Sequence, residues 1–500
     1  MTVKEALEKL RSFEDTSFAL GHAGGILNYD GSTIAPKQSA KVRALTQGEL
    51  SRISYELTTA PETVEMIETL KTNENELDFV TARKASELYR DLDHMRRIPK
   101  DLFVEYQKLC VESDAVWHEA KANNDYASFK PYLQKMFDMS RQIALCIEPD
   151  KDPYDTQLNE FERGLTAETC EKFFATLKAG IVPLLQKVIA SPNQVREPLL
   201  EGNFPVTVQR EFSDYIMRVM GLDPERSIIG ETEHPFTTDF SKYDVRITTH
   251  YHEDAVLSSM YSVIHEGGHA LYELNIGDDI TTSCLGGGVS MAMHESQSRF
   301  YENIIGRSRE FCGVILPWLT EHFPAQLSGL TQDRLYRAVN ASAPSLIRTE
   351  ADELTYCLHI MVRFELERMM YAGTITADDL PHEWNRLYKE YLGIDVPDDK
   401  RGVLQDSHWS FGAIGYFPSY AIGSAYGAQY LEEMNKSFDV FAAVAAGDFS
   451  PISDWFRERI WKYGKLYDPS DLFKKVCGEF RPEVYVKYLE DKFSGIYGLT

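Results

Sequence analysis

The segment His265-Glu-Gly-Gly-His269 constrains this chain most strongly, because its two histidines can act together only if the segment is helical. An α-helix turns about 100° per residue, so side chains four residues apart lie on one face, one turn apart. Apolar or small residues recur at spacings of three and four through the same segment, at Leu257, Tyr261, Ile264, Gly268 and Leu271. This spacing predicts an amphipathic helix that presents the two imidazoles side by side.

Two imidazoles at this spacing can bind one Zn²⁺ at about 2.0–2.1 Å, and the glutamate between them lies beside the same metal. Such a carboxylate takes a proton from a zinc-bound water, whose pKa falls to about 7, and later passes it to the leaving amine. We therefore expect Glu266 to be the general base of a zinc-dependent peptide hydrolase. A coincidental buried histidine pair is the alternative, and the amphipathic flanks of the segment argue against it.

The two glycines of the segment disfavour a helix, since each costs roughly 1 kcal/mol relative to alanine in a helix interior. A helix that keeps both Gly267 and Gly268 is expected to need another backbone, or the substrate, very close to it.

The composition predicts one large globular unit rather than several domains. The 500 residues are 43% hydrophobic and 26% charged, and no linker, repeat or low-complexity tract divides them. We expect a mostly α-helical, two-lobed protein spanning residues 1–500. Its sub-regions are a helical half over 1–230, a metal-site and substrate-binding region over 231–420, and C-terminal helices over 421–500.

Charge and cysteine content exclude several classes of partner. With 77 acidic and 52 basic side chains, a net charge of −25 and no basic cluster, the chain is not expected to bind nucleic acid. Seven scattered cysteines without a C-x-x-C pair indicate free thiols in a reducing compartment. The charged N-terminus and the lack of 18 consecutive apolar residues predict no membrane partner and a cytoplasmic location.

Local patterns predict helices separated by turns, with one exception. Helical spacing covers residues 101–119, 127–146 and 166–189, with turn signals at 150–153 and 191–193 between such stretches. Residues 233–253 are rich in Thr, Val, Ile and Tyr, which indicates one or two short strands whose edge can hold an extended peptide. A helix is also expected to begin with Ser450 as its N-cap and Pro451 at its first position.

A catalytic zinc normally has three protein ligands and one open position. Glu295 is the best candidate for the third ligand, because the turn at 286–288 can fold a second helix back against the first. On spacing alone, four other acidic residues remain rivals: Glu273, Asp278, Asp279 and Glu302. Ten of the 13 histidines lie between residues 234 and 408, which places the active region in that span.

Six ordered motifs over about 175 residues give the sequence a specific resemblance. They are His234-Pro-Phe236; Asp244-Val-Arg-Ile-Thr248; the segment 265–269; His294-Glu-Ser-Gln297; Ile347-Arg-Thr-Glu-Ala-Asp352; and Gly402-Val-Leu-Gln-Asp-Ser-His-Trp409. In this the chain resembles the carboxypeptidase Taq family of zinc metallocarboxypeptidases.

The resemblance implies a helical fold with a deep groove, a small β-sheet near the metal helix, and a homodimer. It implies removal of single residues from peptide C-termini with broad specificity. It also implies that one zinc ion per chain is held by His265, His269 and Glu295, with Glu266 as base. Co²⁺ or Mn²⁺ would suit the same donor set.

A carboxypeptidase needs a cation that recognises the chain end, and the planar fork of arginine suits a carboxylate. Arg348 is the candidate that the resemblance also favours, although it could simply pair with Asp352 four residues later, for about 0.3–0.5 kcal/mol. Arg246 is the second candidate, with Asp244 as the residue that would otherwise hold it.

The tetrahedral intermediate needs donors beyond the metal. His408 and Tyr420 are similar to a pair in related helical zinc dipeptidases, and Tyr416 competes with Tyr420 for the same role. A buried structural tyrosine is the alternative for either. His234 is expected either to contact substrate or to cap a strand. Three further residues are expected to orient ligands or Arg348: Asp352, Gln405 and Asp406.

Two other functions compete with the carboxypeptidase. The same zinc core would support endopeptidase or dipeptidyl cleavage, in which no cation needs to bind a terminal carboxylate. A catalytically silent, zinc-stabilised peptide-binding scaffold is the second alternative. A structural zinc site is usually closed by four ligands, and a retained glutamate base serves no purpose there.

Overall fold

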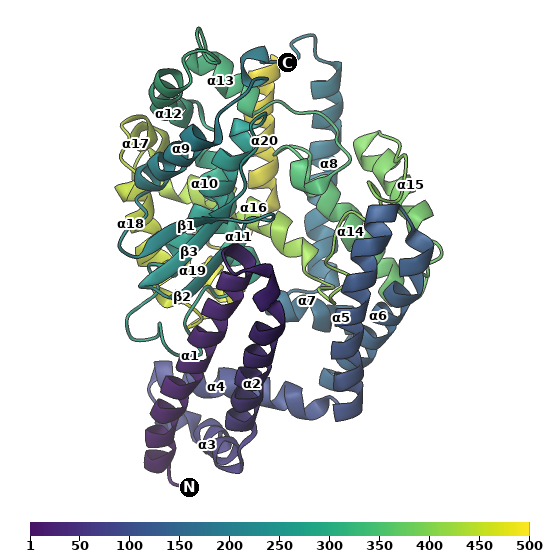
Figure 1. Cartoon of the computed structure of the whole chain (residues 1–500), viewed down its shortest axis with the longest axis vertical. Coiled ribbons are helices and arrows are strands. Elements are labelled where there is room, and N and C mark those ends of the chain that lie inside the picture. Colours follow the sequence, from purple (N-terminus) through teal and green to yellow (C-terminus); the bar gives the residue numbers. More distant parts are fainter. Residues whose placement is uncertain (500) are drawn as a thin grey trace.

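The computed structural model of the chain describes residues 1–499, and it is helical over most of its length (Figure 1). The first nine α-helices are α1 Val3–Thr33, α2 Ala40–Thr59, α3 Pro61–Thr72, α4 Phe79–Arg97, α5 Lys100–Asn123, α6 Tyr126–Ile147, α7 Pro153–Phe161, α8 Ala167–Ala190 and α9 Val206–Met220. The central ones are α10 Val256–Glu273, α11 Met291–Arg299, α12 Arg309–His322, α13 Gln332–Val339, α14 Tyr356–Ala372 and α15 Leu380–Leu392. The last are α16 Phe417–Met434, α17 Val440–Ala445, α18 Ser450–Arg459, α19 Pro469–Cys477 and α20 Pro482–Tyr497.

The predicted mostly helical fold is confirmed, and the expected helices have their caps. Helix α8 begins after Thr166, whose hydroxyl accepts a hydrogen bond from the backbone N–H of Thr169. The helix at residue 450 starts where predicted, but its N-cap is Phe449 and not Ser450. The backbone N–H of Ser450 donates to the carboxylate of Asp448 at 3.0 Å, so Asp448, two residues before the predicted N-cap, satisfies this N–H at the start of the helix.

A three-stranded sheet lies beside α10, with the order β1-β3-β2. Strands β2 (Thr237–Ser241) and β3 (Asp244–Thr249) fall within the predicted segment and pair antiparallel. Strand β1 (Ser227–Glu231) pairs parallel with β3 and was not predicted, because five residues interrupted by a glycine carry too little alternation. Strand β2 is one of the two edge strands of this sheet.

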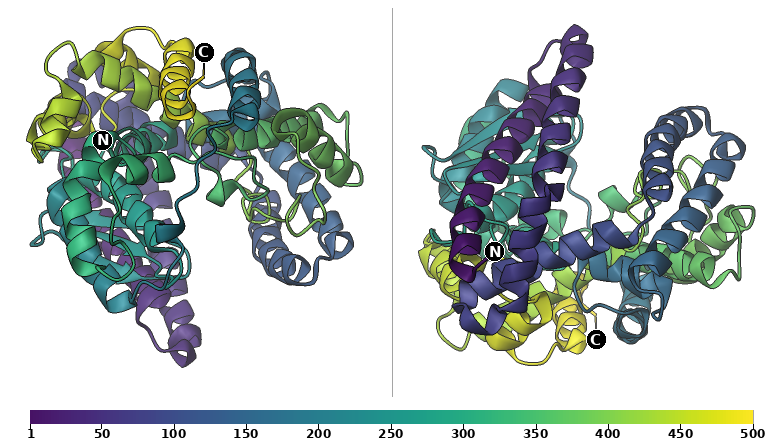
Figure 2. Two further views of the ribbon diagram at one scale, coloured as in Figure 1. Left: turned by 90° about the horizontal axis from the view of Figure 1, so that it is seen from above. Right: turned by 90° about the horizontal axis from the view of Figure 1, so that it is seen from below.

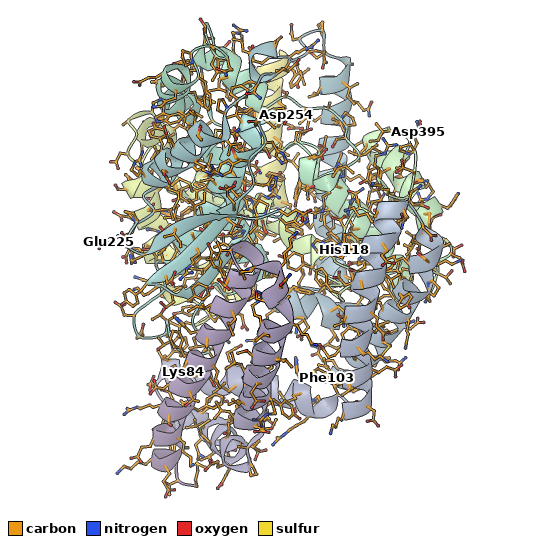
Figure 3. The ribbon with its side chains drawn as sticks, in the orientation of Figure 1. Lys84, Phe103, His118, Glu225, Asp254 and Asp395 are labelled. Carbon is orange, nitrogen blue, oxygen red and sulfur yellow. The ribbon has the colours of Figure 1, made fainter. Side chains whose placement is uncertain are left out.

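The helices form two groups that are joined along one side of the molecule (Figure 2). One group surrounds the sheet and includes α1, α9, α10 and α12, while the other contains α5, α6 and α15 (Figure 1). At the base of the first group, Lys84 of α4, labelled in Figure 3, forms a 2.9 Å ion pair with Glu14 of α1. Of the described helices, α8 alone has the length and apolar composition of a membrane-crossing segment, and its apolar face packs against α20.

The two glycines of α10 have different neighbours, and the expected close backbone is found at Gly268 but not at Gly267. A Cβ atom on Gly268 would lie 2.7 Å from Cα of Ser298 in α11, so this glycine permits two helix backbones to touch. A Cβ on Gly267 would meet the flexible end of Met220 at 2.8 Å. On the other side of α11, a Cβ on Gly423 of α16 would lie 2.6 Å from Cβ of Glu295. Helix α11 is therefore held closely between α10 and α16.

Candidate active site and metal centre

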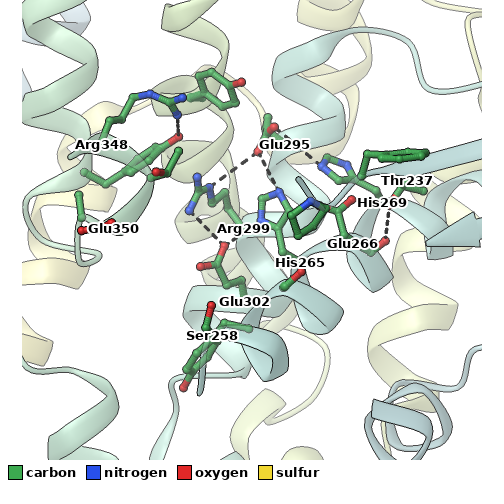
Figure 4. Close-up of a pocket in the computed structure, with 18 of the residues that line it drawn as sticks. Thr237, Ser258, His265, Glu266, His269, Glu295, Arg299, Glu302, Arg348 and Glu350 are labelled. Atoms are coloured by element: carbon green, nitrogen blue, oxygen red, sulfur yellow. Dashed lines mark hydrogen bonds and ion pairs between the residues drawn. The ribbon is translucent and has the colours of Figure 1, made fainter. Parts of the chain in front are cut away.

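A cavity of about 970 Å³ runs along the face of α10 that carries the two histidines (Figure 4). Strand β2 and the residue before it form one wall, through Thr237 and Phe236. Helices α10 and α11 form the floor, and the 3₁₀ turn Arg348–Glu350, α14 and α16 form the opposite wall. The cavity thus draws on segments that lie more than 100 residues apart in the sequence.

His265, His269 and Glu295 converge at the floor of this cavity, with one donor atom from each lying within 4.8 Å of the others. The Nε2 atom of His265 lies 3.9 Å from Glu295 Oε2, and the Nε2 atom of His269 lies 3.8 Å from Glu295 Oε1. The fold therefore brings together the three residues that the resemblance implied as ligands.

The acidic rivals for the third position lie elsewhere. Glu302 Oε2 is 2.8 Å from His265 Nδ1, and Glu273 Oε1 is 2.6 Å from His294 Nε2, whose Nδ1 is in turn 2.8 Å from His269 Nδ1. Both glutamates thus lie behind the histidines and orient their rings. Asp278 and Asp279 are exposed outside the cavity.

The donor set fits a divalent metal. The Nδ1 atoms of both histidines are occupied by hydrogen-bond partners, which leaves their Nε2 atoms directed at Glu295. Burial and the neighbouring His294 lower the pKa of His269 well below its usual range, so the ring is in the neutral form that binds a metal. Two imidazoles and one carboxylate are the protein ligands of many catalytic zinc sites.

Glu266 lies in the same cavity with its carboxylate almost fully buried. The hydroxyl of Thr237, from strand β2, donates a 2.6 Å hydrogen bond to Glu266 Oε2. Burial raises the pKa of Glu266, while the charge of His265 and the hydrogen bond from Thr237 oppose that rise. The carboxylate is thus oriented and more basic than an exposed glutamate.

Arg299, which the sequence did not single out, binds two carboxylates of the site, those of Glu295 and Glu302. Arg299 Nη1 donates to Glu302 Oε2 at 3.1 Å, and its Nε lies 3.7 Å from Glu295 Oε2. Burial would raise the pKa of Glu302, but Arg299 and the hydrogen bond from His265 hold it well below its usual range. A signal was present, since Arg299 follows Glu295 by four residues and therefore shares its helix face.

Arg348 lines the cavity wall and is only 7% exposed. Its Nε and Nη2 donate to Asp406 Oδ1 at 2.9 and 2.8 Å, and its Nη1 donates to the hydroxyl of Tyr356 at 3.2 Å. The alternative pairing with Asp352 is absent. Asp352 instead accepts from Ser342 at 2.8 Å and caps the backbone that leads into α14.

The second cation candidate occupies a different environment. Both carboxylate oxygens of Asp244 accept from Arg246, at 2.9 and 2.7 Å, and the guanidinium stacks over Tyr29 of α1. Arg246 does not line the cavity, so its observed contacts hold β3 to α1.

His234 is exposed before β2, and its carbonyl accepts from Thr232 at 2.8 Å. Its neighbours Pro235 and Phe236 line the cavity, while His234 itself does not.

Tyr416 and Tyr420 both line the cavity at the start of α16. The Nε2 atom of His408 lies 3.1 Å from the Tyr420 hydroxyl, so His408 supports that tyrosine from behind. Burial and the nearby charge of Arg348 lower the pKa of His408 to about 3, which leaves the ring neutral. Gln405, another predicted orienting residue, accepts the backbone N–H of Arg348 at 2.9 Å.

Comparison with known proteins gives close matches over the whole chain. Residues 9–493 match the family described as carboxypeptidase Taq (M32) metallopeptidase. Thermostable carboxypeptidase 1 of Pyrococcus furiosus is 38% identical over 496 residues, and carboxypeptidase 1 of Bacillus subtilis is 36% identical over 496 residues. Each alignment covers at least 98% of both chains. A crystal structure of an M32 carboxypeptidase from Deinococcus radiodurans superposes with a TM-score of 0.95 at 36% identity, covering 99% of this chain and 100% of that one.

Proposed function

The chain belongs to the carboxypeptidase Taq (M32) family and is a metallocarboxypeptidase, and we propose that it releases single C-terminal residues from peptides with broad specificity. We propose Zn²⁺ as the metal and His265, His269 and Glu295 as its ligands, with Co²⁺ or Mn²⁺ as substitutes for the same donors. The observation that carries this proposal is one cavity lined by both the two-histidine, one-glutamate cluster and a buried arginine, Arg348.

When bound, the metal would lower the pKa of a coordinated water and polarise the scissile carbonyl. Glu266 is placed to accept the proton of that water and to return it to the leaving amine. The hydrogen bond from Thr237 keeps one carboxylate oxygen fixed, so the other is free for the proton transfer.

Tyr420 is the proposed donor to the developing oxyanion. When neutral His408 carries its proton on Nε2, it donates to the Tyr420 oxygen and leaves the tyrosine's own proton for the cavity. Tyr416 lines the same wall and is the second candidate, although no hydrogen bond from His408 orients it. Tyr420 is favoured for that reason.

Arg348 is the proposed anchor for the substrate's free carboxylate. Its guanidinium is held in place by Asp406 and Tyr356, so little conformational entropy is lost when a ligand binds. Tyr356 also lines the cavity, and we propose that its hydroxyl, which accepts from Arg348, donates its proton to the same carboxylate.

The decisive experiment compares an N-blocked dipeptide with its C-terminally amidated form, before and after chelation and metal replacement. We expect the free acid to be cleaved at least a hundredfold faster than the amide, and chelation to abolish both activities. Equal cleavage of the two peptides would show an endopeptidase and remove the role of Arg348. Metal binding without hydrolysis of either peptide would indicate the silent scaffold.

A further inference from the structure

Behind the cavity wall, Asp406 is bound by two arginines rather than one. Arg348 approaches Oδ1 from the cavity side, and Arg363 of α14 approaches Oδ2 with Nε at 2.9 Å and Nη2 at 2.7 Å. The guanidinium of Arg363 thus binds the oxygen of Asp406 that Arg348 does not contact. The sequence analysis did not single out Arg363.

Arg363 is sealed inside the protein. Its side chain is 0% exposed, and it stacks on the ring of Trp384 at 4.3 Å. Its Nη1 donates to the carbonyl of His359 at 2.9 Å and to the hydroxyl of Tyr388 at 3.0 Å. No substrate can touch this guanidinium, so any effect on the reaction must act through Asp406 and Arg348.

The three side chains carry a net charge of +1, from two guanidiniums and one carboxylate. A guanidinium does not lose its proton in a protein, so this excess does not titrate away. His359 and His408 are the buried imidazoles nearby, and burial together with the arginines lowers the pKa of both. Lys121 donates from its ammonium to the carbonyl of Gln405 at 2.8 Å. It is itself a cation, so it does not offset the excess positive charge.

Arg299, a further guanidinium nearby, is already paired: it stacks on the ring of Tyr356 at 4.0 Å and pairs with Glu295 and Glu302. Two carboxylates line the same cavity wall: Asp352 is held by Ser342 and Thr355, and Glu350 is exposed, so solvent screens its charge. Of the three members of the cluster, only Arg348 lines the cavity. The uncompensated charge is therefore presented to substrate at that one guanidinium.

We infer that Arg363 is a positioning residue that determines specificity, because it converts a neutral Arg348–Asp406 pair into a cationic cluster that selects peptides with a free α-carboxylate. The inference rests on the proposed role of Arg348. A lone Arg348–Asp406 pair would offer an incoming carboxylate little net attraction, since Asp406 already satisfies the arginine. A neutral amide end gains nothing from the excess charge, so selectivity follows from it.

The test uses the full-length, metal-loaded protein and two variants of one residue, R363Q and R363K. For R363Q we expect the KM of an N-blocked free-acid dipeptide to rise at least tenfold with kcat within about threefold of wild type. The preference for the free acid over the amide should fall at least tenfold. R363K retains the charge and should keep that preference within about threefold.

A binding measurement separates recognition from chemistry. Calorimetric titration of metal-free protein with N-acetylphenylalanine should show at least tenfold weaker binding to R363Q and near wild-type binding to R363K. Y388F is the matched control, because it removes a hydrogen-bond partner of Arg363 without changing the charge, and its selectivity should equal that of wild type. R363M, which keeps an apolar stem against Trp384, replaces R363Q if the latter fails to fold.

Each outcome decides a separate point. Equal loss of selectivity in R363Q and R363K would overturn the charge argument, since only the geometry of Asp406 would then matter. Unchanged selectivity in R363Q, alongside a loss in R348Q, would remove Arg363 from recognition while leaving the proposed function intact. Unchanged selectivity in R348Q itself would overturn the carboxylate anchor, and this inference with it.

Discussion

Two buried carboxylates of this site, Glu266 and Glu302, have pKa values that are shifted in opposite directions. Burial raises the pKa of Glu266, which lies beside a histidine and a hydroxyl but has no arginine on it. Arg299 reverses the same burial effect at Glu302, whose pKa is held low. The partner therefore decides which buried glutamate is a proton acceptor and which is a permanent anion.

Replacing the proposed base tests the chemistry directly. In E266Q we expect kcat to fall by about three orders of magnitude or more, because glutamine cannot accept the proton. The metal should stay bound, since its proposed ligands are untouched. Steady-state kinetics with metal content measured by atomic absorption checks both points, and wild-type turnover by metal-loaded E266Q would exclude Glu266 as the base.

The pH dependence of kcat/KM should carry the pKa of Glu266. Activity requires the carboxylate, so it should fall as the pH drops through that pKa. The hydrogen bond from Thr237 lowers this pKa, so T237V should move the acidic limb to higher pH. A T237V profile that shifts to lower pH or stays in place would contradict the assignment, with T238V of the same strand as control.

At the scale of elements, glycines decide how close the proposed ligands come. Helix α11 carries Glu295 and lies against α10 at Gly268 and against α16 at Gly423. Any side chain at these two positions would separate the helices and so move Glu295 away from the histidines. Glycine is unfavourable in a helix interior, and at Gly268 the reason for it is the close contact with the backbone of α11.

Two neighbouring substitutions test the packing. G268A places a methyl group 2.7 Å from the backbone of Ser298, and we expect it to destabilise the metal-free protein by about 1–3 kcal/mol and weaken metal binding. G267A meets only side-chain ends, those of Met220 at 2.8 Å and Leu222 at 3.3 Å, and with the better helix propensity of alanine it should cost under about 1 kcal/mol. Urea unfolding and chelator competition measure both, and equal effects would contradict the backbone contact.

The N-terminus of α11 carries a buried carboxylate from a distant segment. Glu162 Oε2 accepts the backbone N–H of Ala292 at 3.1 Å, and burial raises the pKa of Glu162 from 4.5 to about 7. The folded state thus binds this proton more tightly than the unfolded state. The stability that comes from the neutral form is present below pH 4.5 and is lost as the pH rises to about 7.

In E162Q this pH-dependent loss should disappear. We expect wild type to lose stability relative to E162Q by on the order of 2–3 kcal/mol between pH 4.5 and pH 8. Urea unfolding of both proteins across this range measures the difference. A stability difference between wild type and E162Q that stays constant with pH, or that shifts in favour of wild type as the pH rises, would show that the pKa of Glu162 is not raised in the folded state.

At the scale of the whole molecule, the site is a junction of distant segments. Strand β2, helices α10 and α11, the turn at Arg348 and the start of α16 all contribute to one cavity. A metal bound to His265, His269 and Glu295 would tie α10 to α11 in the centre of the fold. Its binding free energy therefore contributes to folding.

Removing the metal should lower the thermal stability of the whole chain. At a free Zn²⁺ concentration of 1,000 times Kd the expected stabilisation is about 4 kcal/mol, and Co²⁺ or Mn²⁺ should restore part of it. Calorimetry with chelator and metal addition measures the shift in Tm. E295Q is the control, and a Tm shift as large as that of wild type in this variant would place the metal elsewhere.

We also propose that two chains form a homodimer, as the resemblance to the family implies. Sedimentation equilibrium at micromolar concentration should give twice the mass of one chain. A mass equal to one chain over the whole concentration range would refute the homodimer. The assignment of the chain as a metallocarboxypeptidase does not depend on this result.

The sequence by itself determined the local parts of this protein. Residues four apart on a helix share a face whatever surrounds them, so the helix that carries His265 and His269 followed from spacing alone. The long helices of the first half, such as α5, α6 and α8, followed from the same periodicity. The family resemblance, which rested on motifs with fixed local spacing, is confirmed.

Only the tertiary structure decided which distant groups meet. Arg348 is held by Asp406, 58 residues away, and not by Asp352 four residues away, because a 3₁₀ turn rather than an α-helix carries it. Glu273 and Glu302 are spaced as plausibly as Glu295, yet the packing of α11 on α10 places only Glu295 opposite both imidazoles. Such contacts depend on how helices pack, and that information is distributed over the whole chain rather than over any one segment.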